Sequence, residues 1–197
     1  MENVFDALLG ELTSEEGARA LASDLGTDPT RTATAARSAL ATLFAALSRN
    51  AEEPSGSHAL LAALDEDHRG SGRDDPGGIR PAEEAGEAIL GHVLGGRRQA
   101  LERAIGQDVG LDPAIVGRLL AILAPLVMSA LGRAQREHRL GAQELSYELE
   151  RGRQRAETSM GARFGPLGGI VDGDAGGRID PATGNRGKTL LKRLLGR

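Results

Sequence analysis

Apolar residues recur along most of this chain at intervals of three and four, the spacing that places side chains on one face of an α-helix. Near the start, such a run comprises Val4, Phe5, Leu8, Leu9 and Leu12. Similar runs follow up to about residue 140, and no pattern typical of a parallel sheet accompanies them. The spacing therefore predicts an all-α, multihelical fold.

Residues that begin and end helices divide the first 50 residues into three helices. Thr13-Ser14-Glu15-Glu16 has the pattern of a capping box, with Thr13 as the N-cap of the second helix. Gly26 is a typical helix end, because glycine adopts the left-handed conformation without strain. Asp28-Pro29 then opens a helix that we expect to run to about Arg49.

Between residues 50 and 81 the periodicity weakens and then stops. Ser57 is placed to cap a short helix over 58–64. Residues 65–80, DEDHRGSGRDDPGGIR, are rich in glycine and charge and show no hydrophobic period. We expect this stretch to be an acidic linker between two parts of the molecule.

Helices resume after the linker. Pro81 opens one that ends at Gly95-Gly96, and the next helix, over 97–109, ends at Gly110. The side chains expected to face inward from the first of these helices are Ala88, Ile89, Val93 and Leu94.

The most apolar helix of the chain begins at Asp112-Pro113. Its large apolar side chains over 115–131 cover most of the circumference, and Arg118 is the only charge before Arg133. Such a helix is buried on several sides, so we expect it to be the central element. Pro125 removes one backbone donor within it and is expected to bend it.

The C-terminal part of the chain differs in character. Residues 141–158 predict a charged helix that is either exposed or rests on a partner. Residues 159–197 are expected to be a flexible, Gly-rich tail, and their last ten, KTLLKRLLGR, form a basic amphipathic pattern. Ten residues are too few to be helical alone, so this end is expected to dock on its own fold, a groove or a membrane surface.

Two stretches resemble each other at a fixed offset of 84 residues. Gly26–Pro29 matches Gly110–Pro113 and, without a gap, Ala46–Arg49 matches Ala130–Arg133. Both stretches belong to the order helix, short helix, Gly-x-Asp-Pro, long helix. We therefore expect two related helical units, with the second long helix packed between them. The two units are residues 1–64 and 81–140.

The second unit also resembles a known family. The likeness is carried by Ile89–Gly96 (ILGHVLGG), Gly110–Pro113 (GLDP) and Leu120–Met128 (LAILAPLVM). These segments are similar to the YidB-like family, the bacterial domain of unknown function 937, and the likeness covers about residues 1–140. The resemblance implies a cytoplasmic bacterial protein with repeated helices, and it brings no enzymatic activity or catalytic residue with it.

Composition and charge remove several classes of function. The 197 residues include no cysteine, which excludes disulfides, thiolate zinc sites and a cysteine nucleophile. No stretch approaches the roughly 18 uninterrupted apolar residues of a membrane span, and the start lacks a secretory signal, so a cytoplasmic location is expected. Residues 51–87 carry 10 acidic and 3 basic side chains, whereas 164–197 carry 3 and 6, so the two regions can attract each other.

Two sequence motifs in the tail partly match known ligand-binding loops. Asp172, Asp174 and Asp180 have the spacing of three calcium-loop ligands, but two further ligands of such a loop are missing. Residues 182–189 end like a phosphate-binding loop but lack its first glycine and the strand that should precede it. We expect no metal, no cofactor and no catalytic residue, and hence no enzyme.

Arginines occur in two places where they could contact a nucleic-acid backbone. They are Arg97, Arg98, Arg151, Arg153, Arg155 and Arg163. Glutamates alternate with the arginines of the 141–158 helix at helical spacing, and no aromatic platform for bases is present. We therefore expect a solvated helix face in which opposite charges pair, and no nucleic-acid partner.

These features favour a non-enzymatic interaction or scaffold protein that self-associates or binds a helical protein. The contacts are expected from the 115–131 helix, which few aromatic residues can cover, and from the end of the tail. The residues assigned to contact are Leu119, Ile122, Leu123, Leu126, Val127, Leu190, Leu191, Leu194 and Leu195. The alternative is a regulatory binding module for nucleic acid or divalent ions, which would use the Arg-rich helix or the Asp172 loop.

Overall fold

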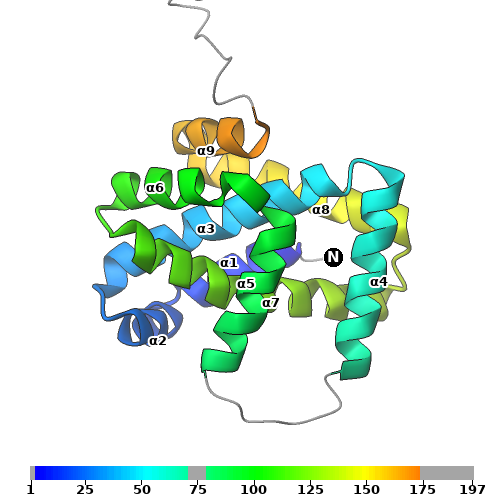
Figure 1. Ribbon diagram of the computed structural model, residues 1–197, viewed down its shortest axis with the longest axis horizontal. Helices are drawn as coiled ribbons and strands as arrows, with labels where there is room; N and C mark the ends of the chain where they lie inside the picture. Colours follow the sequence, from blue (N-terminus) through cyan, green and yellow to red (C-terminus); the bar gives the residue numbers. More distant parts are fainter. Residues whose placement is uncertain (1–2, 71–78, 174–197) are drawn as a thin grey trace, which may run out of the picture.

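The computed structural model describes the chain over residues 3–70 and 79–173, and its side chains over 3–65 and 83–173. Every regular element in these residues is helical and none is a strand, so the all-α fold is confirmed (Figure 1). Short 3₁₀ turns lie at Gly95–Arg97 and Gly161–Arg163. The helices are α1 (Val4–Thr13), α2 (Glu15–Leu25), α3 (Pro29–Asn50), α4 (Pro54–Gly70), α5 (Ile79–Val93), α6 (Arg98–Val109), α7 (Pro113–His138), α8 (Ala142–Met160) and α9 (Phe164–Val171).

The helix ends predicted at the two Gly-x-Asp-Pro sequences are confirmed. Gly26 and Gly110 take nearly the same left-handed conformation, with φ of 67° and 70°. A residue with a Cβ would adopt that conformation only with strain. Asp28 and Asp112 each accept a hydrogen bond from a backbone N–H in the first turn of the following helix. The same local chemistry thus begins both long helices, α3 and α7.

The predicted N-cap of α2 is wrong by one residue. Ser14 caps the helix, and its hydroxyl accepts a hydrogen bond from the N–H of Gly17 at 3.0 Å. Thr13 belongs to α1, where its hydroxyl donates to the carbonyl of Leu9 at 2.7 Å. This local bond lets α1 continue for one residue more than the pattern predicts.

Helices α4 and α5 are longer than predicted. Because α4 begins at Pro54, Ser57 lies within its first turn and donates to the Pro54 carbonyl at 3.0 Å instead of capping a helix. Both helices extend into the stretch predicted as a linker, so the linker over 65–80 is wrong at both ends. Residues 71–78 lie outside the described part of the chain. Charged and glycine-rich sequence shows no apolar period, so the sequence did not indicate that α4 and α5 extend into this stretch.

The inward face of α5 is rotated from the expected one. Val93 and Leu94 are buried as expected and Ile89 is partly buried, but Ala88, which was expected to face inward, is exposed, and Leu90 is buried. The rotation follows from Gly86, which is buried where α5 meets α7. The glycine brings the two backbones together and so decides which side of α5 turns toward the core.

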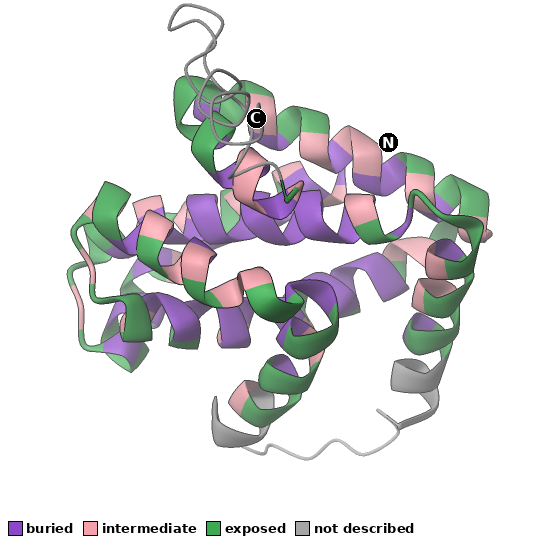
Figure 2. Ribbon diagram, turned by 45° about the horizontal axis from the view of Figure 1, so that its top comes forward, coloured by how far each residue is buried: buried purple, intermediate pink, exposed green. Residues whose placement is uncertain are grey.

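Helix α3 lies at the centre of the fold. It packs against α1, α2, α5, α6, α7, α8 and α9, and its buried positions run around its whole circumference (Figures 1 and 2). Most of these positions hold alanine, serine or threonine, which let other helices approach closely. The prediction that α7 is the central helix is wrong, because small side chains, and not the largest apolar ones, admit neighbours on every side.

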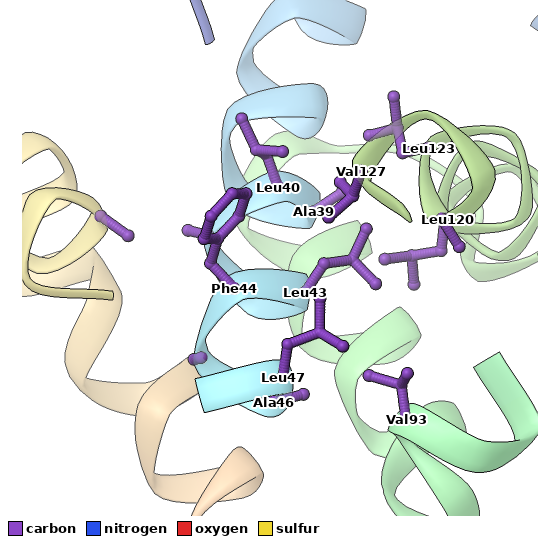
Figure 3. Packing of buried hydrophobic residues seen from close by; sticks show 14 of the residues in the cluster. Ala39, Leu40, Leu43, Phe44, Ala46, Leu47, Val93, Leu120, Leu123 and Val127 are labelled. Atoms are coloured by element: carbon purple, nitrogen blue, oxygen red, sulfur yellow. The ribbon is translucent and has the colours of Figure 1, made fainter. Parts of the chain in front are cut away.

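Figure 3 shows how α3 divides the core. Leu43 points toward Leu120 of α7, whereas Phe44 points to the other side, toward α8. Phe44 also meets Phe5 of α1 edge-on, with ring centroids 5.3 Å apart and an interplanar angle of 86°. Gly152 of α8 leaves room for this ring, since a Cβ there would overlap it. One face of α3 therefore holds α1 and α8, and another holds α7.

Helix α7 is long and apolar enough to cross a membrane by length and composition alone. In the fold, 61% of its most apolar stretch is buried inside the molecule, which is the pattern of a core helix. Pro125 lies within the helix without ending it, and the bend expected there stays a prediction.

The two predicted units contact each other reciprocally. Helix α7 packs against α1 and α2, and α3 packs in turn against α5 and α6. Arg31 of α3 donates to the carbonyl of Gly110, and Arg118 of α7 donates to the carbonyl of Asp24, both at 3.3 Å. The buried side chains of both units form one cluster. Two related units would give this arrangement, and the duplication itself stays a prediction.

The C-terminal part is more ordered than predicted. Helix α8 agrees with the charged helix expected over 141–158 and buries Leu145 and Leu149. The prediction of an irregular tail from 159 onward is wrong at its start, because α9 forms and buries Phe164, Leu167 and Val171. The glycines between these apolar residues hide the helical period in the sequence.

The close crossing of α5 and α7 gives a stability test. A Cβ at Gly86 would overlap the carbonyl oxygen of Ala121, so Gly86→Ala should lower the free energy of unfolding by about 1 to 3 kcal/mol. Gly91, in the same helix, is exposed and has nothing near it, so Gly91→Ala should raise that free energy by about 0.5 to 1 kcal/mol. Urea denaturation of both variants measures the contrast, and equal effects would refute the close crossing.

Candidate docking surface

One face of α7 is open to solvent, and its middle part is apolar. The outward positions at helical spacing are Arg118, Ile122, Pro125, Leu126, Ser129 and Arg133. Leu126 is 44% exposed, which is unusual for a leucine in the middle of a core helix, and Ile122 and Pro125 are partly exposed. We define Ile122, Pro125, Leu126 and Ser129 as the α7 stripe.

Helices α5 and α4 both cross α7, at different points along it (Figure 1). The crossing of α5 is at Ala121, against which Gly86 lies. The crossing of α4 is at Gly132, where an added Cβ would lie 3.9 Å from Cδ2 of Leu64. The α7 stripe lies between these two points and is therefore bounded at both ends by other helices.

The structure separates the contact residues predicted on α7 into two groups. Leu119, Leu123 and Val127 are at most 1% exposed and belong to the core, so their assignment to an external contact is corrected. Leu126 is exposed and Ile122 partly so, which leaves these two available. The sequence could not separate the groups, because α7 is apolar around most of its circumference. The four leucines predicted from the tail lie outside the described residues.

An acidic rim adjoins the stripe at the α5 crossing. Glu83, Glu84 and Glu87 of α5, together with Arg118 and Ala121 of α7, line an open hollow of about 350 Å³. Nη2 of Arg118 lies 3.2 Å from Oε1 of Glu83. No sequence motif marks these glutamates, although the excess of acid over 51–87 was a signal of this rim.

The rim is held partly by an ion pair to α6. Arg98 binds Glu87 and also Glu102, so its guanidinium is shared between two carboxylates. Its hydrogen bond lowers the pKa of Glu87, against the smaller opposing effect of burial. The same contacts raise the pKa of Arg98 above its ordinary value. Both groups therefore stay charged at neutral pH.

A second hollow, of about 520 Å³, lies between the starts of α4 and α8 and is lined by both polar and apolar groups. Tyr147 at its edge is 68% exposed. The hydroxyl of Ser57 donates to the Pro54 carbonyl, and that of Ser146 donates to the Ala51 carbonyl at 2.9 Å. Both hydroxyls are therefore engaged by backbone, and the hollow does not present an activated nucleophile.

Each arginine considered for nucleic-acid binding has a partner within the fold. The partners are the carbonyl of Val171 for Arg97, Glu87 and Glu102 for Arg98, Glu148 for Arg151, Glu150 and Glu157 for Arg153, Asp6 for Arg155 and Asp108 for Arg163. The predicted pairing of opposite charges on α8 is confirmed. All of these arginines except Arg97 thus have a carboxylate as partner.

The remaining candidate ligands are not brought together. Asp172 ends α9 and lies 3.5 Å from a guanidinium nitrogen of Arg49. Asp174, Asp180 and the phosphate-loop-like residues 182–189 lie outside the described residues. Within the described part of the chain, no three acidic or histidine side chains are grouped as metal ligands would be.

Glu150 of α8 accepts hydrogen bonds both from its own helix and from α3. Its carboxylate accepts hydrogen bonds from Arg153 at 2.8 Å and from Ser48 of α3 at 2.9 Å. The Arg153 bond lowers the pKa of Glu150 most, with Ser48 and Gln154 adding to it against the effect of burial. The carboxylate form thus ties α8 to α3.

Because its pKa is lower in the fold than in the unfolded chain, Glu150 stabilises the protein above a pH of about 4.5, and this contribution is lost as the pH falls through the folded pKa. Glu150→Gln should therefore lower the free energy of unfolding by about 0.5 kcal/mol at pH 7 and have little effect near pH 2. Exposed Glu137 supplies the control Glu137→Gln, which should have little effect at either pH. Urea titrations at both values test this, and a pH-independent loss would contradict it.

Comparison with known proteins places most of the described fold in one family. The family model described as "Bacterial protein of unknown function (DUF937)" matches residues 6–134. This stretch runs from α1 into α7 and contains the stripe and the acidic rim, whereas α8 and α9 lie beyond it. No curated protein and no solved structure matches the chain. Since the match covers well over half of the chain, it belongs to this bacterial family of unknown function, as the YidB-like resemblance predicted.

Proposed function

We propose that the protein is a non-enzymatic interaction module that self-associates in the bacterial cytoplasm, and that the α7 stripe is its contact surface. The observation that carries this proposal is the exposure of Leu126, in the middle of a helix that is otherwise a core element. The fold leaves this side chain in water although it buries the leucines and valines around it. Covering such a side chain in a contact is favourable.

The surroundings of the stripe support a protein contact. An apolar centre with a charged and polar rim is the usual anatomy of a protein interface, and here Arg118 and Arg133 lie at the two ends. The other exposed large apolar side chain among the described residues, Tyr147, has polar neighbours at helical spacing on α8, such as Gln143, Glu144 and Arg151, whereas Leu126 has Ile122 and Pro125 beside it. The stripe is thus the better candidate of the two.

The alternative functions receive less support from the geometry. Pairing of the α8 arginines with glutamates leaves a nucleic-acid backbone little to bind. The first aspartate of the calcium-like loop, Asp172, faces Arg49. The two hollows hold no arrangement of nucleophile and base that would suggest an enzyme. No second function is therefore proposed.

The test compares Leu126→Glu with the matched variant Tyr147→Glu, which adds the same charge at the other exposed apolar residue. Light scattering after size exclusion gives the mass of each protein from about 1 μM to about 1 mM. The wild type should exceed 20.5 kDa as its concentration rises, and Leu126→Glu should weaken this association at least tenfold. Tyr147→Glu should behave as the wild type. Equal association of all three proteins would contradict the proposed surface.

A further inference from the structure

The α7 stripe has the length of a short helix. Its two boundaries, at Ala121 and Gly132, are eleven residues apart, or about 16 Å along the helix axis. A helix of the last ten residues, 188–197, would be about 15 Å long. Its four leucines fall on one side, opposite its four cations. The stripe and this segment therefore match in length and in apolar character.

Their charges are complementary. Residues 188–197 carry four basic side chains and no acidic one. The α5 end of the stripe has Glu83, Glu84 and Glu87, with Arg118 beside them. The α4 end has exposed Asp65 but also exposed Arg133 and Arg136, so the excess of acid lies at the α5 end. Glu83 and Glu87 are already bound by arginines, but the hollow still has more carboxylates than cations. At the α5 end, a basic segment is thus preferred over an acidic or a neutral one.

The place where the described chain ends favours contact within one molecule. The carbonyl of Val171 accepts a hydrogen bond from Arg97, so α9 ends beside the start of α6, close to the end of α5. From there, fourteen residues, 174–187, precede the basic segment. A chain of that length spans about 21 Å on average, and α5 itself is about 22 Å long. The segment can therefore reach the stripe along α5.

We propose that residues 188–197 cover the α7 stripe of their own chain, with the leucines on Ile122 and Leu126 and the cations toward the α5 glutamates. The stripe then alternates between this internal segment and a second copy. Self-association requires release of the segment, so the C-terminus sets the concentration at which copies associate. The docking is argued from the stripe and from the sequence of the segment, whereas its role as a regulator rests on the function proposed above.

The expected size of the effect follows from the tether. A short tether holds a segment at an effective concentration in the millimolar range. If the free segment binds with a dissociation constant of about 0.1 mM, the stripe is open about one-tenth of the time. Each copy then associates about tenfold less tightly than a copy whose segment cannot dock.

The first experiment uses the full chain with Leu191→Asp and Leu194→Asp, which destroy the apolar side of the segment. The matched control carries Ala182→Asp and Thr183→Asp, the same added charge in the tether. By light scattering, the leucine variant should self-associate at least tenfold more tightly than the wild type, and the control should match the wild type. Weaker association of the leucine variant would show that the segment acts between copies and would overturn docking within one chain.

The second experiment measures docking without relying on self-association. A labelled peptide of residues 188–197 is titrated with the full-length leucine variant and followed by fluorescence anisotropy. It should bind this variant, bind the wild type about tenfold more weakly because the stripe is occupied, and lose its binding when Leu126→Glu is added to the variant. Adding Tyr147→Glu instead should leave binding unchanged, and added salt should weaken it.

The two proposals can fail separately. If no protein self-associates while the peptide binds as expected, the docking stands and the function proposed above is wrong. If the wild type associates through Leu126 but the peptide binds nowhere, or binds regardless of Leu126→Glu, the docking is overturned. Binding of the peptide to phosphatidylglycerol vesicles but not to the protein would assign the segment to a lipid surface and also overturn it.

Discussion

The enclosure of α3 is the constraint on which the rest of the structure depends. A helix can be covered on every side only if its neighbours approach closely, and α3 meets this condition with alanine, serine and threonine at most buried positions. Phe44 and the leucines fill the gaps that the small residues leave. With so few aromatic residues in the chain, close approach of backbones replaces large side chains as the source of packing.

The position of α7 follows from the position of α3. Since α3 takes the centre, α7 covers one of its sides, and one side of α7 faces outward. The helices on either side, α4 and α5, cross α7 at two points and leave the part between them open. The exposed Leu126 is a consequence of this arrangement, so the candidate contact surface is created by the packing and not by a sequence motif.

Many charged side chains of this molecule are paired with other side chains of the fold. Arg151 and Arg153 of α8 bind glutamates of the same helix, Glu150 also binds Ser48 of α3, and Arg98 holds two glutamates. Such bonds fix the orientation of the helices more than they add to stability, because pairs near the surface are screened by water. The charge that remains at the α5 end of the stripe is mostly acidic, which is the polarity that a basic partner segment would meet there.

The sequence by itself determined the all-α class, the two Gly-x-Asp-Pro turns, the charged α8 and the family, because helix caps, glycine conformations and residue periods act over a few neighbouring residues. It missed α9, where glycines hide the period of Phe164, Leu167 and Val171, and it misplaced the ends of α4 and α5. Only the tertiary structure decided which helix is central and that Leu123 is buried while Leu126 is exposed. Both residues are leucines on an almost wholly apolar helix, so their difference depends on where α3, α4 and α5 pack, and that is a property of the whole chain.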